Sequence, residues 1–298
     1  MLRMFVSTIL LPPRHPDRLP VLRLCADAWR RAAASARPLA RFAALPFVLL
    51  VILEGGIRQA AGVAETWIDV TILSALQAIA QAVLLTPLTV AAYRLFMFGR
   101  GTVARDALDD FPPGTAPILA ISLVFALALL PLGDLYTLIE NEPALNPAIA
   151  LAYYAFVMAG FALYVLLVVR TLFLFNQAAA GHDLNLSLAW RQTRGHGWRL
   201  LALIALVALP WAGLIGVIDW YVLDALGFVP DFSDWSVWAG LLGIAAALVA
   251  MTVLVAAAGT FAHAHLTGFP LPGEHSGRAY QYSLPLDAAT PPASSESA

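Results

Sequence analysis

The stretch that decides the fold is AWRQTRGHGWRLLALIALVALP, residues 189–210. Its charges and aromatic rings gather at one edge of an apolar block. Three arginines, two tryptophans and a histidine come first, and the apolar block follows with no loop between them. Tryptophan favours the interface between membrane and water, where arginine can lay its stem on apolar surface and keep its head wet. The stretch therefore predicts a short interfacial helix that turns into a transmembrane helix, with Gly195 and Gly197 permitting the bend.

The composition of the whole chain is that of an integral membrane protein. Of its 298 residues, 60% are hydrophobic and 12% are charged, and the mean hydropathy is +0.78. Soluble domains have about 45–50% apolar and about 25% charged residues. The apolar residues come in long blocks rather than in alternating faces, which is typical of membrane-spanning helices. We therefore predict an all-α integral membrane protein.

Six apolar blocks are each long enough to cross a bilayer, which takes about 20 helical residues. Only helices can cross as single segments, because backbone groups in lipid must be satisfied internally. We expect transmembrane helices at residues 38–57, 67–98, 116–139, 147–175, 198–221 and 235–263. Residues 1–36 are then a cytoplasmic segment with an amphipathic interfacial helix, residues 37–266 the six-span membrane domain, and residues 267–298 a disordered cytoplasmic tail.

The distribution of arginine predicts the orientation of the chain in the membrane. All 17 basic residues are arginine, and all except Arg58 fall on one side of the six expected spans. Cytoplasmic loops carry the excess of basic residues, so both termini are expected to be cytoplasmic. The formal net charge of −2 gives no indication of a nucleic-acid partner.

The chain shows signs of an internal repeat. Ala28-Trp29-Arg30 aligns with Ala107-Leu108-Asp109 and with Ala189-Trp190-Arg191, each ahead of a span. The second and fourth spans also end alike, with YRLFMFGRG from residue 93 and RTLFLFNQAAAG from residue 170. We predict three repeats of about 80 residues, each an interfacial elbow helix followed by a two-helix hairpin.

Few polar residues lie within the expected spans. Gln77 and Gln81 are four residues apart and share one helix face, which favours either a polar lining for a permeation path or interhelical amide bonds. Glu54 is the acidic residue closest to the membrane, and we interpret it as an interfacial helix end rather than as a proton carrier. Small residues at 239, 243 and 247 form a stripe on the sixth expected span, which favours close helix packing.

No motif in the sequence indicates catalysis or metal binding. The metalloprotease His-Glu-x-x-His, Walker glycine-loop, Gly-x-Ser-x-Gly and Cys-x-x-Cys patterns are all missing, and Cys25 is the only cysteine. His263 and His265 are two residues apart, so on a helix they point to different sides. We therefore expect no catalytic, cofactor or metal site and a protein that is not an enzyme.

Residues 176–201, NQAAAGHDLNLSLAWRQTRGHGWRLL, resemble a stretch of a group of bacterial six-span proteins. The group includes the YciC-like inner-membrane proteins and the membrane domain attached to some glycerophosphodiester phosphodiesterases, in which an Ala-Trp…Gly…Trp-Arg-Leu-Leu elbow leads into a span. The resemblance extends over residues 26–268 and implies an all-helical module of the bacterial inner membrane. The group has no established catalytic residues, so none is carried over.

Two functions remain open from the sequence. In the first, a non-enzymatic membrane protein contacts anionic phospholipid headgroups or a membrane-protein partner through its basic interfacial helices. The candidate headgroup contacts are Arg30, Arg31, Trp190, Arg191, Arg194, Trp198 and Arg199. In the second, the chain is a permease for a small amphiphilic or apolar solute, with Gln77 and Gln81 as its polar lining.

Overall fold

The computed structural model describes residues 19–61, 67–99, 114–140, 147–226, 233–269 and 271–272. Within these ranges the chain forms seven α-helices and no strand, which confirms the predicted all-α class. The helices are α2 (Val21–Ala61), α3 (Trp67–Phe98), α5 (Thr115–Glu140), α6 (Pro147–Ala179), α7 (Leu186–Gln192), α8 (Gly197–Leu226) and α9 (Trp235–Thr267). The bounds of α3 are those predicted, and α6, α8 and α9 run a few residues beyond the predicted spans.

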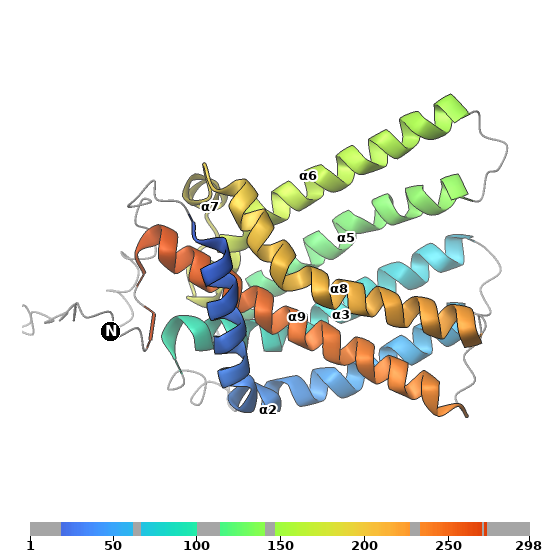
Figure 1. The fold of residues 1–298 in the computed structure, drawn as a ribbon, viewed down its shortest axis with the longest axis horizontal. Helices are drawn as coiled ribbons and strands as arrows, with labels where there is room; N and C mark the ends of the chain where they lie inside the picture. The colour runs from blue at the N-terminus through green and yellow to red at the C-terminus, as the bar shows by residue number, and fades with distance from the viewer. Residues whose placement is uncertain are drawn as a thin grey trace, which may run out of the picture.

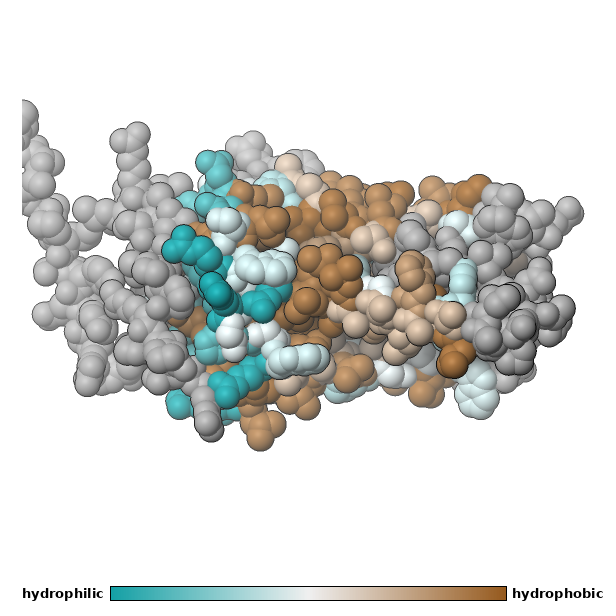
Figure 2. Space-filling model, turned by 90° about the horizontal axis from the view of Figure 1, so that it is seen from above, coloured by the Kyte–Doolittle hydropathy of each residue, from teal (hydrophilic) through white to brown (hydrophobic). Residues whose placement is uncertain are grey.

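Five of the helices, α2, α3, α6, α8 and α9, are long and apolar enough to cross a membrane. A sixth, α5, has 26 residues, and its segment Thr115–Ala128 is apolar. Figure 2 shows hydrophobic residues covering the length of the helices and hydrophilic residues gathered at one end. Phe156 and Met158 on α6 are both 64% exposed, which suits a surface that faces lipid. The chain is therefore an all-helical, multi-pass membrane protein.

Helix α2 changes direction along its length. Figure 1 shows its first part lying across the other helices before it turns and runs along the bundle. Pro38 and Pro46 lie inside the helix, where each removes a backbone donor and favours a bend. The interfacial helix and the first span, expected as separate segments on either side of residue 37, are thus joined in one 41-residue helix.

Helix α9 lies at the centre of the bundle and contacts α2, α3, α6 and α8 (Figure 1). A Cβ at Gly243 would lie 2.9 Å from Ile218 Cδ1, so the missing side chain allows α8 to approach α9 closely. This confirms the packing role predicted for Gly243. Ala247 of the same stripe is fully buried, whereas Ala239 is exposed.

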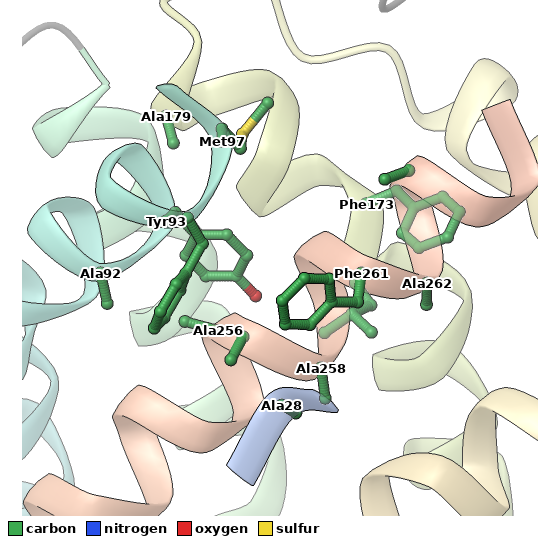
Figure 3. Close-up of a cluster of buried hydrophobic side chains, with 14 of the residues drawn as sticks. Ala28, Ala92, Tyr93, Met97, Phe173, Ala179, Ala256, Ala258, Phe261 and Ala262 are labelled. Atoms are coloured by element: carbon green, nitrogen blue, oxygen red, sulfur yellow. The ribbon is translucent and has the colours of Figure 1, made fainter. Parts of the chain in front are cut away.

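The largest apolar core lies where the ends of α3, α6 and α9 meet. Figure 3 shows Tyr93 of α3 and Phe261 of α9 pointing toward one another across this core. The Tyr93 ring stacks on Phe175 of α6 at a centroid distance of 5.7 Å. A Cβ at Gly259 would lie 3.1 Å from Tyr93 Oη, so α9 and α3 are close together here. This core supports the end of the bundle where α7 lies.

Candidate functional site

A buried carboxylate on α2 is bonded to two side chains of α3. Glu54 is only 2% exposed. Gln77 Nε2 lies 3.0 Å from each of its carboxylate oxygens, and Gln81 Nε2 donates to its Oε1 at 2.7 Å. The two glutamines therefore share a face, as predicted, and the interhelical amide bonds expected of them are present. Their common partner is Glu54.

The same carboxylate lies near an ion pair that reaches α8. Arg58 lies one turn after Glu54, with its Nη2 3.9 Å from Glu54 Oε2. Arg58 Nη2 also donates to Asp219 Oδ1 on α8. The side chain of Arg58 is 10% exposed and that of Asp219 is 38% exposed. We call Glu54, Arg58, Gln77, Gln81 and Asp219 the Glu54 cluster.

Glu54 was expected at a helix end at the membrane interface, and the helix-end part of that expectation was wrong. Helix α2 continues to Ala61, about two turns further, and Glu54 is buried where α2 meets Gln77 and Gln81 of α3. A buried carboxylate needs hydrogen-bond donors, and two glutamine amides provide them. Sequence reasoning missed Glu54, Arg58 and Asp219 as members of one site. The available signal was the four-residue spacing of Glu54 and Arg58, which matches that of the glutamines on the next helix.

At the other end of the bundle, α7 and α8 form the elbow that residues 189–210 predict. Asn185 caps α7, and its Oδ1 accepts from Leu188 N at 2.9 Å. Residues 193–196 form the turn, in which Gly195 has a φ of +83°, a left-handed conformation that favours glycine. The predicted role of Gly195 in the bend is thus confirmed. Gly197 has no positive φ and simply begins α8.

Arg170 of α6 holds this elbow in place. Its Nη1 donates to the carbonyl oxygen of Thr193 at 2.7 Å, and its guanidinium lies 5.2 Å from the ring centroid of Trp190. A Cβ on Gly197 would be only 3.4 Å from Arg170 Nη2, so the start of α8 packs on the same guanidinium. Sequence reasoning used Arg170 only to orient the chain. Its structural role depends on α6 packing beside α7, which the sequence does not reveal.

The predicted headgroup contacts lie at this same end of the bundle. Figure 1 shows α7 and the crosswise part of α2 there, and Figure 2 shows hydrophilic residues gathered toward one end of the molecule. Trp198 is 84% exposed and Trp190 is 40% exposed. Arg31 is half-buried and donates to the carbonyl oxygen of Pro272, so its guanidinium is bonded within the protein and not presented to headgroups. We call the remaining residues the basic face: the exposed Arg30, Arg191 and Arg194, the half-buried Arg199, and Trp190 and Trp198.

Histidines also lie beside the elbow. Burial lowers the pKa of His196, and the nearby Arg199 and His265 lower it further. Burial also lowers the pKa of His182. On α9, His263 is buried and His265 is exposed, so they point to different sides as predicted. Among the residues that the structure describes, no group of three His, Cys, Asp or Glu side chains could hold a metal ion.

Comparison with protein-family models, with curated proteins and with solved structures finds no match for this chain. The resemblance of residues 176–201 to YciC-like proteins therefore stays a prediction from the sequence. The Glu54 cluster and the basic face are the two features of the described chain that bear on function.

Proposed function

We propose that this chain is a non-enzymatic protein of the bacterial inner membrane that binds anionic phospholipid headgroups through its basic face. The observation that carries this proposal is the elbow held by Arg170, which leaves Arg191 and Arg194 exposed beside the exposed ring of Trp198. Each basic residue near an anionic membrane surface contributes about 1 kcal/mol of binding free energy. Tryptophan at the same level anchors the elbow in the headgroup layer.

We further propose six spans, with α5 as the sixth, and cytoplasmic N- and C-termini. The basic face then lies at the cytoplasmic surface, where anionic lipid attracts arginine. Arg58 is the one arginine that this orientation puts on the opposite side. Its bond to Asp219 neutralises its charge, so the charge of Arg58 does not oppose this orientation.

The same proposal includes three repeats of an elbow helix and a hairpin. Two elbows support it, because Ala28 and Ala189 are both fully buried while Trp29 and Trp190 are 38% and 40% exposed. The expected middle elbow falls largely in residues 104–113, which lie outside the described residues. The ends of α3 and α6 also match, with buried pairs at Leu95 and Leu172, Phe96 and Phe173, and Met97 and Leu174.

Lipid binding can be tested by native mass spectrometry of the detergent-solubilised protein titrated with phosphatidylglycerol or phosphatidylcholine. Replacing Arg191, Arg194 and Arg199 with glutamine removes about 3 kcal/mol of attraction, which weakens phosphatidylglycerol binding roughly 100-fold. The matched control replaces the same three residues with lysine and should retain most of the binding. Unchanged phosphatidylglycerol binding in the glutamine variant, or equal binding of the two lipids to the native protein, would refute the proposal.

The Glu54 cluster favours a second candidate function, a permease for a small amphiphilic or apolar solute. Ionisable residues within membrane spans often mark transport pathways, and Glu54 is bonded to the two glutamines predicted to line one. Proteoliposomes should then take up an amphiphilic probe that crosses protein-free liposomes only slowly, such as ethidium. Replacing Gln77 and Gln81 together with leucine should abolish this uptake while the protein stays folded, and intact uptake would remove both residues from the pathway.

A further inference from the structure

We infer that the residues just after α9 form a strap that holds Arg31 back from lipid headgroups, and that opening this strap adds Arg31 to the headgroup-binding surface. The strap consists of Gly268, Phe269, Leu271 and Pro272. Figure 1 shows the first part of α2 crossing the end of α9, where the strap begins. The contacts of the strap are observed, whereas its effect on lipid binding rests on the proposed function.

The strap turns back onto the bundle directly at the end of α9. Gly268 caps the helix with a φ of +73°, a left-handed conformation that glycine adopts without strain, and its N–H donates to the Ala264 carbonyl oxygen. Phe269 and Leu271 are then buried, with only 4% and 7% of their surface exposed. These two side chains therefore anchor the strap in the apolar core.

The strap packs on the ends of two helices. The Phe269 ring meets Phe98 of α3 edge-on at a centroid distance of 6.3 Å and lies 6.2 Å from the ring of His263 on α9. A Cβ at Gly99 would lie 3.3 Å from Pro272 Cβ, so the end of α3 also lies directly against Pro272. The position of Pro272 thus depends on the seating of Phe269.

Arg31 of α2 is the arginine that the strap retains. Its Nη2 donates to the carbonyl oxygen of Pro272, and its side chain is half-buried, whereas the neighbouring Arg30 is exposed. This bond occupies one guanidinium donor and fixes the direction of the side chain. Once released, Arg31 can reach the headgroup layer that Arg30 faces. Asp27 is paired with Arg30 at 3.0 Å, so if Asp27 captures Arg31 instead, Arg30 is set free. Either way the surface gains one available guanidinium.

A buried histidine beneath the strap favours its opening. His263 is fully buried, and neither of its ring nitrogens has a hydrogen-bond partner among the residues that the structure describes. A buried polar group without a partner destabilises the closed arrangement. Lifting Phe269 removes one of the rings that keep water from His263. Opening therefore costs less than the burial of Phe269 and Leu271 alone suggests.

Arginine-specific labelling of the full chain in detergent tests whether the strap covers Arg31. Phenylglyoxal modifies accessible guanidinium groups, and tandem mass spectrometry distinguishes Arg31 from Arg30. In the native protein we expect Arg31 to react more slowly than Arg30. In Phe269→Ala, which removes both ring contacts of the strap, we expect this protection to be lost.

Phe125→Ala is the matched control for the loss of a phenylalanine. Its ring packs against the same apolar core but contacts Tyr164 and Phe175, so Arg31 should stay protected. Arg31 reacting as fast as Arg30 in the native protein would overturn the inference, and this comparison needs no variant. Continued protection in folded Phe269→Ala would also overturn it. Should that variant fail to fold, Leu271→Ala removes a smaller buried side chain of the strap and takes its place.

Native mass spectrometry with phosphatidylglycerol tests the consequence for lipid binding. One additional basic residue near an anionic surface strengthens binding about five-fold, so Phe269→Ala should bind this lipid about five-fold more tightly than the native protein. In an Arg31→Gln background the same change should give no gain, and an equal gain there would overturn the link between strap and arginine. Equal binding of phosphatidylglycerol and phosphatidylcholine by the native protein would instead refute the proposed function, and the labelling would still decide whether the strap covers Arg31.

Discussion

Replacing Arg170 with methionine should open the elbow between α7 and α8 while the bundle stays folded. Methionine keeps much of the length of arginine but removes the bond to the Thr193 carbonyl and the contact with the Trp190 ring. A hydrogen bond to a charged group contributes about 1.5–3 kcal/mol, and a partly exposed cation–π contact contributes about 0.5–1 kcal/mol. The Thr193 carbonyl keeps its bond from His196 N, so we expect the lower end, about 2 kcal/mol.

Hydrogen exchange measured by mass spectrometry in lipid discs reports this local opening. A loss of about 2 kcal/mol should speed exchange in peptides covering residues 189–200 roughly 30-fold, with little change in peptides from the centre of α9. Arg23→Met is the matched control, because Arg23 is exposed on α2, carries the same charge and is not part of the basic face. Equal exchange rates at the elbow in the two variants would refute the role assigned to Arg170.

Two further predictions concern the core and the elbow. Gly259→Ala puts a Cβ 3.1 Å from the buried Tyr93 Oη and should destabilise the protein by about 1–3 kcal/mol. Gly213→Ala is the control, because a Cβ at Gly213 would have no atom within 4 Å. This variant should leave the thermal unfolding temperature unchanged or raise it. A lower unfolding temperature for both variants would contradict this. Because the pKa of folded His196 is lowered, the elbow should lose stability as the pH falls below about 6.5. His196→Asn should remove this loss, as measured by hydrogen exchange at pH 7 and pH 5, and an equal acid response in both proteins would argue against it.

Local sequence patterns were enough to predict the helices. An apolar block of about 20 residues has only one stable form in lipid, so the bounds of α3 follow directly from composition. Gly195 could be predicted for a similar reason, since a turn directly before a span needs a residue that tolerates positive φ. The bend of α2 was harder to predict from the sequence, because a proline can bend a helix without ending it.

The Glu54 cluster depends on contacts between helices, which composition and spacing do not specify. The sequence shows that Gln77 and Gln81 share a face but not which helix that face meets. The partner is set by the packing of α2 on α3, which buries Glu54. Arg170 illustrates the same limit, because its bond to Thr193 joins α6 to the turn that follows α7.

The central claim is that the basic face holds anionic lipid, and extraction of the protein in native-lipid polymer discs tests it most directly. Mass spectrometry of the discs identifies both the lipids and the proteins that stay with the chain. We predict anionic phospholipid above its share in the surrounding membrane, and a fall toward that share when Arg191, Arg194 and Arg199 are replaced with glutamine. A lipid composition equal to that of the membrane, with a protein partner retained at near-equal stoichiometry, would contradict the account.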